Sequence, residues 1–461
     1  MQVFLQGQLL GIEQFVESAG ADFRSLAGRR RYVAVLGELL PRALLRHLGL
    51  APELLGYAGG GRFLIEIPAE TRPVAESWLG GIGTGISAGS GGRLRLIVAI
   101  TENLGDWSDI RRRLAEGAAR LALTPWATRT SVTPVTPDFG PALTASAASF
   151  DPQVPGLITW GGDEPLPLTT HTALVDDGGE PASPEELGQR AAGRPLWGVL
   201  RGDVDRFSVR LRRTMNVEEY CQIAQIYKRF FEGELGYACA AKGDNWRKVT
   251  ILFTGADNFA VFGAWDALIG VAREMQRLFQ LLADEVMREA AGPEGKTISM
   301  ALALASSPDA TLTSVYAEAG RELESAKSIG KDSIALLGRV LEWKQLAEAA
   351  ELKMQMVRLV DEFGASRQYL SELGSFYRES EDVLGLRLNR TKAEISDRPW
   401  RFHRRLARLL DAPGAGREYD RAKAALLGEF IRKKQAHVKL RPAGRVALEW
   451  ARLEAGYAEK R

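Results

Sequence analysis

The chain has 461 residues, which is enough for about three domains of ordinary size. Its apolar fraction of 45% and charged fraction of 26% are typical of a folded globular protein, and a net charge of +2 argues against bulk electrostatic binding of nucleic acid. Two cysteines, Cys221 and Cys239, provide neither a disulfide framework nor a zinc ribbon. The N-terminus lacks a basic leader and no apolar run reaches about 18 residues, so we expect a cytoplasmic protein without a membrane partner.

The first third of the chain contains two segments that recur in the second half. Residues 5–10 read Leu-Gln-Gly-Gln-Leu-Leu and align with residues 200–205, Leu-Arg-Gly-Asp-Val-Asp. The glycine-rich residues 57–63 align in the same way with residues 253–259. The paired glycines are separated by about 52 residues in both halves, a period that indicates an internal repeat of one supersecondary unit.

A stretch of different composition separates the two halves. Residues 124–195 contain 11 of the chain's 20 prolines, with Gly, Ser and Thr between them and little periodicity. This composition predicts a loop-rich connector without a strong core of its own. His171 is isolated in this connector, and we interpret it as an ordinary surface histidine.

The second half carries the residues that are candidates for metal binding and catalysis. Residues 200–205 form an apolar strand that ends on Asp203 and Asp205, and residues 217–235 carry apolar side chains at helical spacing. Residues 249–262 then read as a β-hairpin around the tip Gly255-Ala256-Asp257-Asn258. Strand, helix and hairpin with acids at the strand end and the tip is the arrangement of a palm domain. Palm enzymes use such carboxylates to hold two Mg²⁺ ions against nucleotide phosphates.

The hairpin tip resembles the Gly-Gly-Asp-Asp signature of the large subunit of type III CRISPR effector complexes, the palm protein that makes cyclic oligoadenylates. Further segments are similar to ordered motifs of that family, namely residues 200–205, 263–266, 297–303 and 326–333. The resemblance implies an α+β fold in which two ferredoxin-like palms precede an all-α C-terminal domain. The implied domains are a first palm at 1–123, the connector at 124–195, a second palm at 196–340 and a helical domain at 341–461.

The first copy of the repeat has lost its acids. Gln8 and Leu10 stand where the second copy has Asp203 and Asp205, and Gly61 and Arg62 replace Asp257 and Asn258. Neutral and basic groups do not hold Mg²⁺, so we expect this palm to be structural, or at most a shelf for a nucleotide base.

The second copy is altered less. Asp203 and Asp257 are the candidate metal ligands and, if the site is active, the catalytic residues. The resemblance also implies nucleotide contacts at five positions: Gly255, Ala256, Asn258, Lys327 and Lys331.

Two features of the tip argue against turnover. The Asn258 amide is a weaker ligand than a carboxylate, and Ala256 adds a Cβ where the family has glycine. We therefore expect a degenerate site that requires no cofactor. Retained Mg²⁺ and ATP binding without turnover, and a purely structural use of both aspartates, are the alternatives.

Nuclease chemistry is not expected. The family often begins with a His-Asp nuclease domain, whereas none of the four histidines here is followed by aspartate. Without clustered His and Asp ligands we expect no metal-dependent nuclease site.

The chain from residue 341 onward has helical periodicity, with helices predicted at 341–363, 367–384, 398–410, 419–440 and 443–458. Residues 387–461 hold 20 basic against nine acidic residues. A solvated basic face is one interpretation of this excess, and contact with RNA or a partner subunit is the other. The leading contact candidates are Arg401, Arg404, Arg405, Lys433 and Lys434.

Together these features predict a catalytically inactive, structural large subunit of a type III-like CRISPR effector in antiviral defence. It would organise the 5′ end of the guide RNA, and its partners would be guide and target RNA and the backbone and small helical CRISPR subunits. The alternative is an active palm cyclase that makes cyclic oligoadenylates from ATP. A diguanylate-cyclase-like signalling protein is a more distant alternative, because such a protein needs one palm and a sensor.

Overall fold

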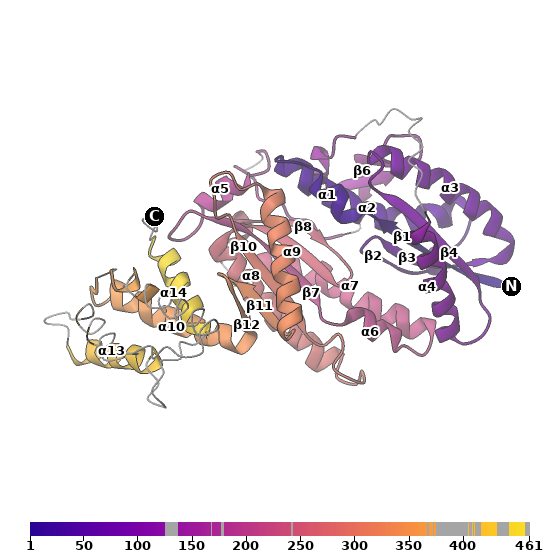
Figure 1. The fold of residues 1–461 in the computed structure, drawn as a ribbon. Helices are drawn as coiled ribbons and strands as arrows, with labels where there is room; N and C mark the ends of the chain where they lie inside the picture. The colour runs from indigo at the N-terminus through magenta and orange to yellow at the C-terminus, as the bar shows by residue number, and fades with distance from the viewer. Residues whose placement is uncertain are drawn as a thin grey trace, which may run out of the picture.

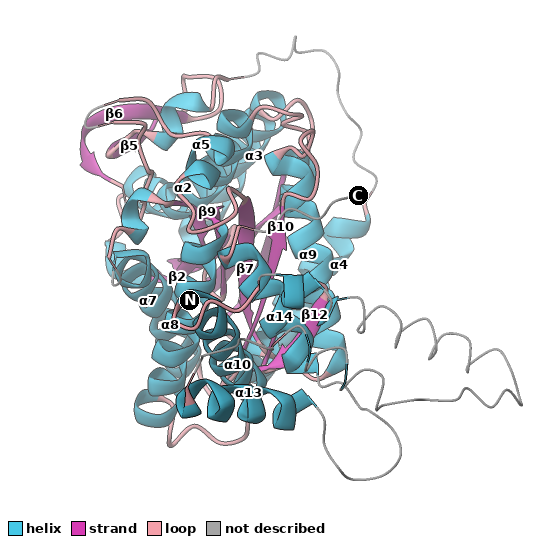
Figure 2. Cartoon of the chain, turned by 90° about the vertical axis from the view of Figure 1, so that its left-hand side faces the viewer, coloured by secondary structure: helices cyan, strands magenta, loops and turns pink. Residues whose placement is uncertain are grey.

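The computed structural model describes residues 1–124, 137–166, 168–176, 179–240, 243–366, 368–371, 373–374, 404, 408, 410, 416–430 and 442–456. These residues form two larger β-sheets, each with its own helices, and a two-stranded sheet, followed by a helical region (Figure 1). The helices lie around the strands (Figure 2). The predicted α+β class is confirmed.

The first sheet has the strand order β2-β3-β1-β4, and all its pairings are antiparallel. Its strands are β1 (Gln2–Leu10), β2 (Leu55–Gly59), β3 (Arg62–Pro68) and β4 (Arg95–Glu102). Its helices are α1 (Ile12–Glu17), α2 (Phe23–His47), α3 (Arg72–Gly89) and α4 (Trp107–Leu123). The α2 helix begins at a capping residue, Asp22, whose carboxylate accepts the backbone N–H groups of Arg24 and Ser25. We call this sheet with its four helices the first palm.

The second sheet has the order β12-β11-β10-β7-β9-β8. Its strands are β7 (Trp197–Val204), β8 (Val249–Thr254), β9 (Asn258–Ala264), β10 (Ile298–Leu304), β11 (Ser333–Leu336) and β12 (Arg339–Glu342). Its helices are α6 (Phe207–Arg212), α7 (Val217–Ala240), α8 (Trp265–Leu281) and α9 (Leu312–Ile329). The α9 helix connects β10 to β11, which pair in parallel. We call this sheet with these helices the second palm.

The two palms repeat one topology down to single residues. The order β8-β9-β7-β10 reproduces β2-β3-β1-β4, the ferredoxin-like arrangement expected from the internal repeat. Gly7 on β1 lies opposite Phe63, and Gly202 on β7 lies opposite Phe259. A Cβ on Gly7 would lie 2.1 Å from the Phe63 ring, and one on Gly202 would lie 2.3 Å from the Phe259 ring. Each glycine therefore makes room for the phenylalanine across from it.

The palms pack against each other reciprocally. The α2 helix of the first palm contacts β8 of the second, and α7 of the second contacts β2 of the first. Apolar side chains from both palms share the same buried clusters, so the two units form one continuous core.

The connector contributes more to the core than its composition predicts. Its described part contains an antiparallel ribbon of β5 (Ala147–Phe150) and β6 (Ile158–Pro165), and the helix α5 (Pro184–Gln189). Phe139 and Leu143 are buried against the first palm. The buried Arg31 guanidinium donates to the Ala142, Leu143 and Ile251 carbonyls, which ties α2, the connector and β8 together.

His171 is not the plain surface residue that we expected from the sequence. Its Nε2 lies 2.5 Å from the Trp246 carbonyl oxygen, and burial lowers its pKa. The backbone of the same segment lies along β8, because the Ile251 N–H donates to the His171 carbonyl at 2.9 Å. This segment therefore covers the outer edge of the second sheet.

The helical region begins with α10 (Trp343–Asp361) and includes α13 (Arg417–Phe430) and α14 (Pro442–Glu454). It is anchored to the second palm, because Trp343 donates to the Ile298 carbonyl and the Arg194 N–H donates to the Leu453 carbonyl. Two further helices are expected at 367–384 and 398–410, and most of their residues lie outside the described part of the chain. In the part of the chain that is described, no helix is both long and apolar enough to cross a membrane.

Candidate functional site

The candidate site lies at the end of β7, beside the β8–β9 tip. Asp203 pairs with Asn258 across the two strands, and the Val204 N–H donates to the Asp257 carbonyl at 2.8 Å. The tip closes on itself through the Gly255 N–H, which donates to the Asn258 carbonyl at 2.6 Å. Strand pairing therefore brings Asp203 and Asp257 together, as the sequence predicts.

Asp203 already has a cationic partner. The Lys327 ammonium lies 2.6 Å from its Oδ1, and both side chains are largely buried. Burial raises the pKa of Asp203, and the attraction of Lys327 opposes this effect. The ion pair leaves one Asp203 oxygen without this contact and places a positive charge beside the carboxylates.

The Asp257 carboxyl ionises less readily than an ordinary aspartate side chain. Burial, followed by repulsion from Asp203, raises its pKa to about 7, against the opposing attraction of Arg62 and Lys327. Near neutral pH this carboxyl therefore carries a proton part of the time. Arg62 comes from the first palm, where it aligns with Asn258, so a basic residue of the first copy acts on the acid of the second.

Asp205 lies next to this pair but has a different role. Its carboxylate accepts hydrogen bonds from the Thr297 and Ser299 hydroxyls, both at 2.8 Å, and from the Asp332 N–H at 2.9 Å. With 2% of its surface exposed, it has no oxygen directed to a ligand. The sequence places three carboxylates near one strand edge, but only Asp203 and Asp257 are candidates for ligand contact.

The altered tip residues pack without backbone strain. Ala256 is buried and is not among the described residues with positive φ, so its Cβ costs nothing in conformation. That Cβ lies beside Gly59 of the first palm, close enough that a side chain added at Gly59 would place its own Cβ 3.4 Å away. The Asn258 amide oxygen turns back toward Gly255, to within 2.2 Å of where a Cβ would sit.

Lys331 points elsewhere. Its ammonium donates to the Lys327 carbonyl at 3.0 Å and so caps the end of α9. Neither Lys327 nor Lys331 is among the residues that line the cavity beside the tip. Their contact with nucleotide phosphates stays a prediction.

This cavity, of about 220 Å³, separates the two palms. The first palm contributes α1, α2 and the β2–β3 glycines, and the second contributes β7, the tip, α7 and Leu323 of α9. Its lining includes three of the predicted site residues, Asp203, Gly255 and Asn258. The lining also includes seven residues that carry a formal charge: Glu13, Arg30, Glu38, Arg201, Asp203, Lys228 and Glu232.

Part of the cavity lining belongs to a network of charged and aromatic side chains. The Arg30 guanidinium lies 2.5 Å from Glu13 and 4.6 Å from the centre of the Phe253 ring. Arg201 lies 3.7 Å from the same glutamate and 4.2 Å from the centre of the Tyr316 ring. Both arginines therefore have a carboxylate and an aromatic partner.

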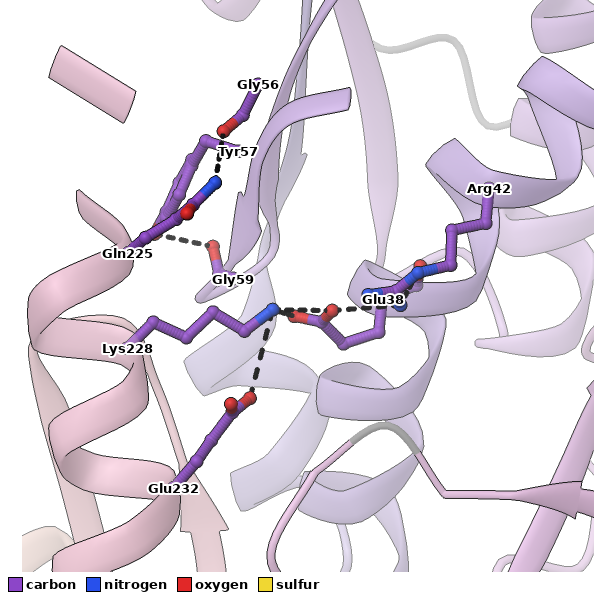
Figure 3. Close-up of polar contacts among 8 residues, drawn as sticks. All are labelled: Glu38, Arg42, Gly56, Tyr57, Gly59, Gln225, Lys228 and Glu232. Carbon is purple, nitrogen blue, oxygen red and sulfur yellow. Dashed lines mark hydrogen bonds and ion pairs between the residues drawn. The ribbon is translucent and has the colours of Figure 1, made fainter. Parts of the chain in front are cut away.

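Another part of the lining belongs to a second network of charged side chains, which Figure 3 shows. The Lys228 ammonium of α7 lies 2.7 Å from both oxygens of Glu38 on α2, and Arg42 lies 3.0 Å from one of them. Glu232 approaches the same ammonium at 3.8 Å. This network joins one palm to the other.

The sequence did not reveal the residues that the first palm brings to the site. Glu38 and Lys228 are 190 positions apart, and no local pattern links them. Tyr57 is also close, since burial and then the charge of Asp257 raise its pKa well above its usual value. The alignment of residues 57–63 with the tip was the available signal, because matched hairpins of a repeat can meet across a shared interface.

The donor set does not fit a two-magnesium centre. Mg²⁺ is held best by several carboxylates, whereas here Asp203 is already paired with Lys327 and Asn258 is a neutral amide. Among the described residues, no group of three or more His, Cys, Asp or Glu side chains is arranged to hold a metal ion.

The predicted contacts of the basic tail fall mostly outside the described residues. Arg401, Arg405, Lys433 and Lys434 are not described, whereas Arg404 is described and exposed.

Residues 196–335 match the family model of Cas10/Cmr2, second palm domain. The single-strand-specific deoxyribonuclease Cas10/Csm1 (subtype III-A) of Thermococcus onnurineus (strain NA1) is 24% identical over 178 residues, covering 36% of this chain and 22% of that protein. A Csm1–Csm4 cassette in complex with cA4 has a TM-score of 0.73 at 17% identity, over 98% of this chain and 70% of that one. A cassette in complex with cA3 has a TM-score of 0.61 at 18% identity, over 76% and 57%.

These likenesses cover the chain unevenly. The chain spans about a fifth of the curated relative and more than half of the two solved chains. The solved structures show the fold, which extends over both palms and the helical region, while the family model identifies the domain that carries Asp203 and Asp257. Residues 196–335 accordingly match a second palm domain of the Cas10/Cmr2 family, and the chain has the two-palm fold of the type III-A Csm1 proteins.

Proposed function

We propose that this subunit is architectural and does not synthesise cyclic oligoadenylates. The observation that carries the proposal is the Lys327–Asp203 ion pair at 2.6 Å, beside an Asp257 whose pKa is raised to about 7. A palm cyclase needs two ionised carboxylates facing two divalent cations. Here the Asp203 carboxylate is held by Lys327, Asp257 is partly neutral, and Asn258, the last residue of the tip, is an amide.

The architectural role consists of holding the guide RNA 5′ end and the neighbouring subunits. Solved relatives with the same fold are complexes of Csm1 with Csm4, which supports a backbone subunit of that kind as a partner of this chain. The basic excess of residues 387–461 supports a contact with RNA phosphates or with the small helical subunits.

An active cyclase is the second candidate, and the cavity between the palms favours it. Two of the solved relatives hold cA3 and cA4, and a third holds AMPPNP. In those proteins the fold therefore accepts adenine nucleotides and their cyclic products.

The assembled complex should form no cyclic oligoadenylate when incubated with target RNA, ATP and Mg²⁺ or Mn²⁺, as followed by mass spectrometry. Target-dependent product from the unmodified complex would establish the cyclase instead. The double variant Ala256→Gly with Asn258→Asp serves as the comparison. Activity that appears only in this variant would place the defect in the tip.

A further inference from the structure

We infer that Glu38 sets the charge selectivity of the cavity between the palms, and that it keeps polyphosphates out by holding Lys228. The inference rests on the proposed function in one respect, since it adds to the absence of turnover a weak binding of ATP. It assigns a role to a first-palm residue that lies outside the aspartate site.

The charges that line the cavity are already paired. Its three cations are Arg30, Arg201 and Lys228, and each lies within ion-pair distance of a lining glutamate. The lining holds four carboxylates against these three cations. One of the four carboxylates, Asp203, is paired with Lys327 from outside the lining. A polyphosphate that enters without metal ions would therefore have to break one of these pairs to contact a cation.

Lys228 is the lining cation that depends most on one carboxylate. Glu38 uses both carboxylate oxygens on it at 2.7 Å, and the Glu38 side chain is 5% exposed. Figure 3 shows the two side chains directed at each other from α2 and α7. The next carboxylate, Glu232, is 3.8 Å away and 28% exposed, so it holds the ammonium less firmly.

The arginines are not equivalent to this lysine. Arg30 and Arg201 are held by Glu13 and also by aromatic rings, so loss of one charge would leave them fixed in place. Neutralising Glu38, in contrast, removes the principal partner of Lys228 and leaves an ammonium directed at the cavity. The lining then balances three acids against three cations, and phosphate oxygens become its natural partners.

The test is a gain of binding that should be lost again when Lys228 is removed. Binding of inorganic tripolyphosphate and of ATP to the full chain, in the presence of EDTA, is measured by calorimetry, with adenosine as the uncharged reference. Glu38→Gln should bind both anions about tenfold more tightly than the unmodified chain, since one charge-assisted hydrogen bond is worth roughly a factor of ten. Adenosine affinity should not change.

The matched control is Glu232→Gln, which removes the same formal charge from the lining but leaves Lys228 bound by Glu38. It should gain less than about threefold, since its exposed contact is weak. Adding Lys228→Met to Glu38→Gln should abolish the gain. Equal anion binding by the unmodified chain and Glu38→Gln, or equal gains in the two glutamine variants, would overturn the inference.

These outcomes are independent of the proposed function. Oligoadenylate synthesis by the unmodified complex would refute the architectural role whatever the calorimetry shows. Unchanged anion binding in Glu38→Gln would refute the charge selectivity and leave an architectural role in place.

Discussion

At the scale of single residues, two aspartates of one strand end have different roles. Asp203 faces Lys327 and the tip, whereas Asp205 is enclosed by two hydroxyls and a backbone N–H. Those donors come from β10 and from the loop after α9, where Lys331 and Asp332 have positive φ. Asp205 therefore holds an unfavourable backbone conformation next to the helix that presents Lys327.

Replacing Asp205 by alanine should lower the free energy of unfolding by about 3 kcal/mol, because it leaves one buried and two partly buried donors without their acceptor. Chemical denaturation followed by circular dichroism provides the measurement. Asp203→Ala is the matched change at the neighbouring carboxylate, and its effect should be smaller, because it removes a single ion pair whose side chains are 21% and 23% exposed. Equal losses in the two variants would show that Asp205 has no special structural role.

At the scale of elements, the sequence predicts the repeated strands and hairpins but not the contacts between the two palms. The Gly7 and Gly202 segments and the two hairpins could be aligned because each copy keeps a glycine opposite a phenylalanine. The pairing of Asp203 with the tip followed from strand and hairpin patterns alone. Glu38, Tyr57 and Arg62 were not foreseen as site residues, because their roles arise only when two separately folded units pack together.

The connector was underestimated for a related reason. Proline-rich composition describes the local chain, whereas the burial of Phe139 depends on the first palm. His171 appeared isolated because its partner, the Trp246 carbonyl, is a backbone group that no composition reveals.

The junction between the helical region and the second palm offers a test at this scale. Gly193 has a φ of +75°, and a Cβ there would lie 2.3 Å from the Leu453 and Glu454 carbonyl oxygens. Gly193→Ala should push α14 off the segment that leads into β7. Hydrogen exchange of the amides at 442–456 should then be about tenfold faster or more.

Gly364→Ala is the control for this junction. It has a similar φ of +68°, and no described atom would lie within 4 Å of its Cβ. It therefore adds backbone strain without a collision. If both variants leave the exchange at 442–456 unchanged, the Arg194–Leu453 hydrogen bond is not what anchors α14.

At the scale of the whole molecule, the near-neutral net charge conceals a basic C-terminal region. Contacts with phosphates release counterions and therefore weaken steeply as salt rises. Reversing Arg401, Arg404 and Arg405 to glutamate should reduce guide-RNA retention by the co-purified complex at about 0.15 M salt, a value near physiological ionic strength. The remaining retention should also depend less on salt.

A control with equal charge change separates this effect from general electrostatics. It reverses three exposed arginines on first-palm helices, namely Arg72, Arg112 and Arg120. Retention should be unaffected in this control. Full RNA content in the tail variant, at this and at higher salt, would identify the tail as a solvated surface.

The reciprocal packing of α2 on β8 and α7 on β2 is the geometry of an isologous dimer written into one polypeptide. In a true homodimer every contact between residue i of one copy and residue j of the other is made twice, once on each side of the dyad. Covalent fusion removes that constraint. Here the long helix that follows the first strand of each sheet carries a glutamate in one half and a lysine in the other, and the two form an ion pair. The alignment of Gly7 with Gly202 places the uncharged Val33 opposite Lys228 in the repeat, so this ion pair is made once and gives the assembly a fixed polarity.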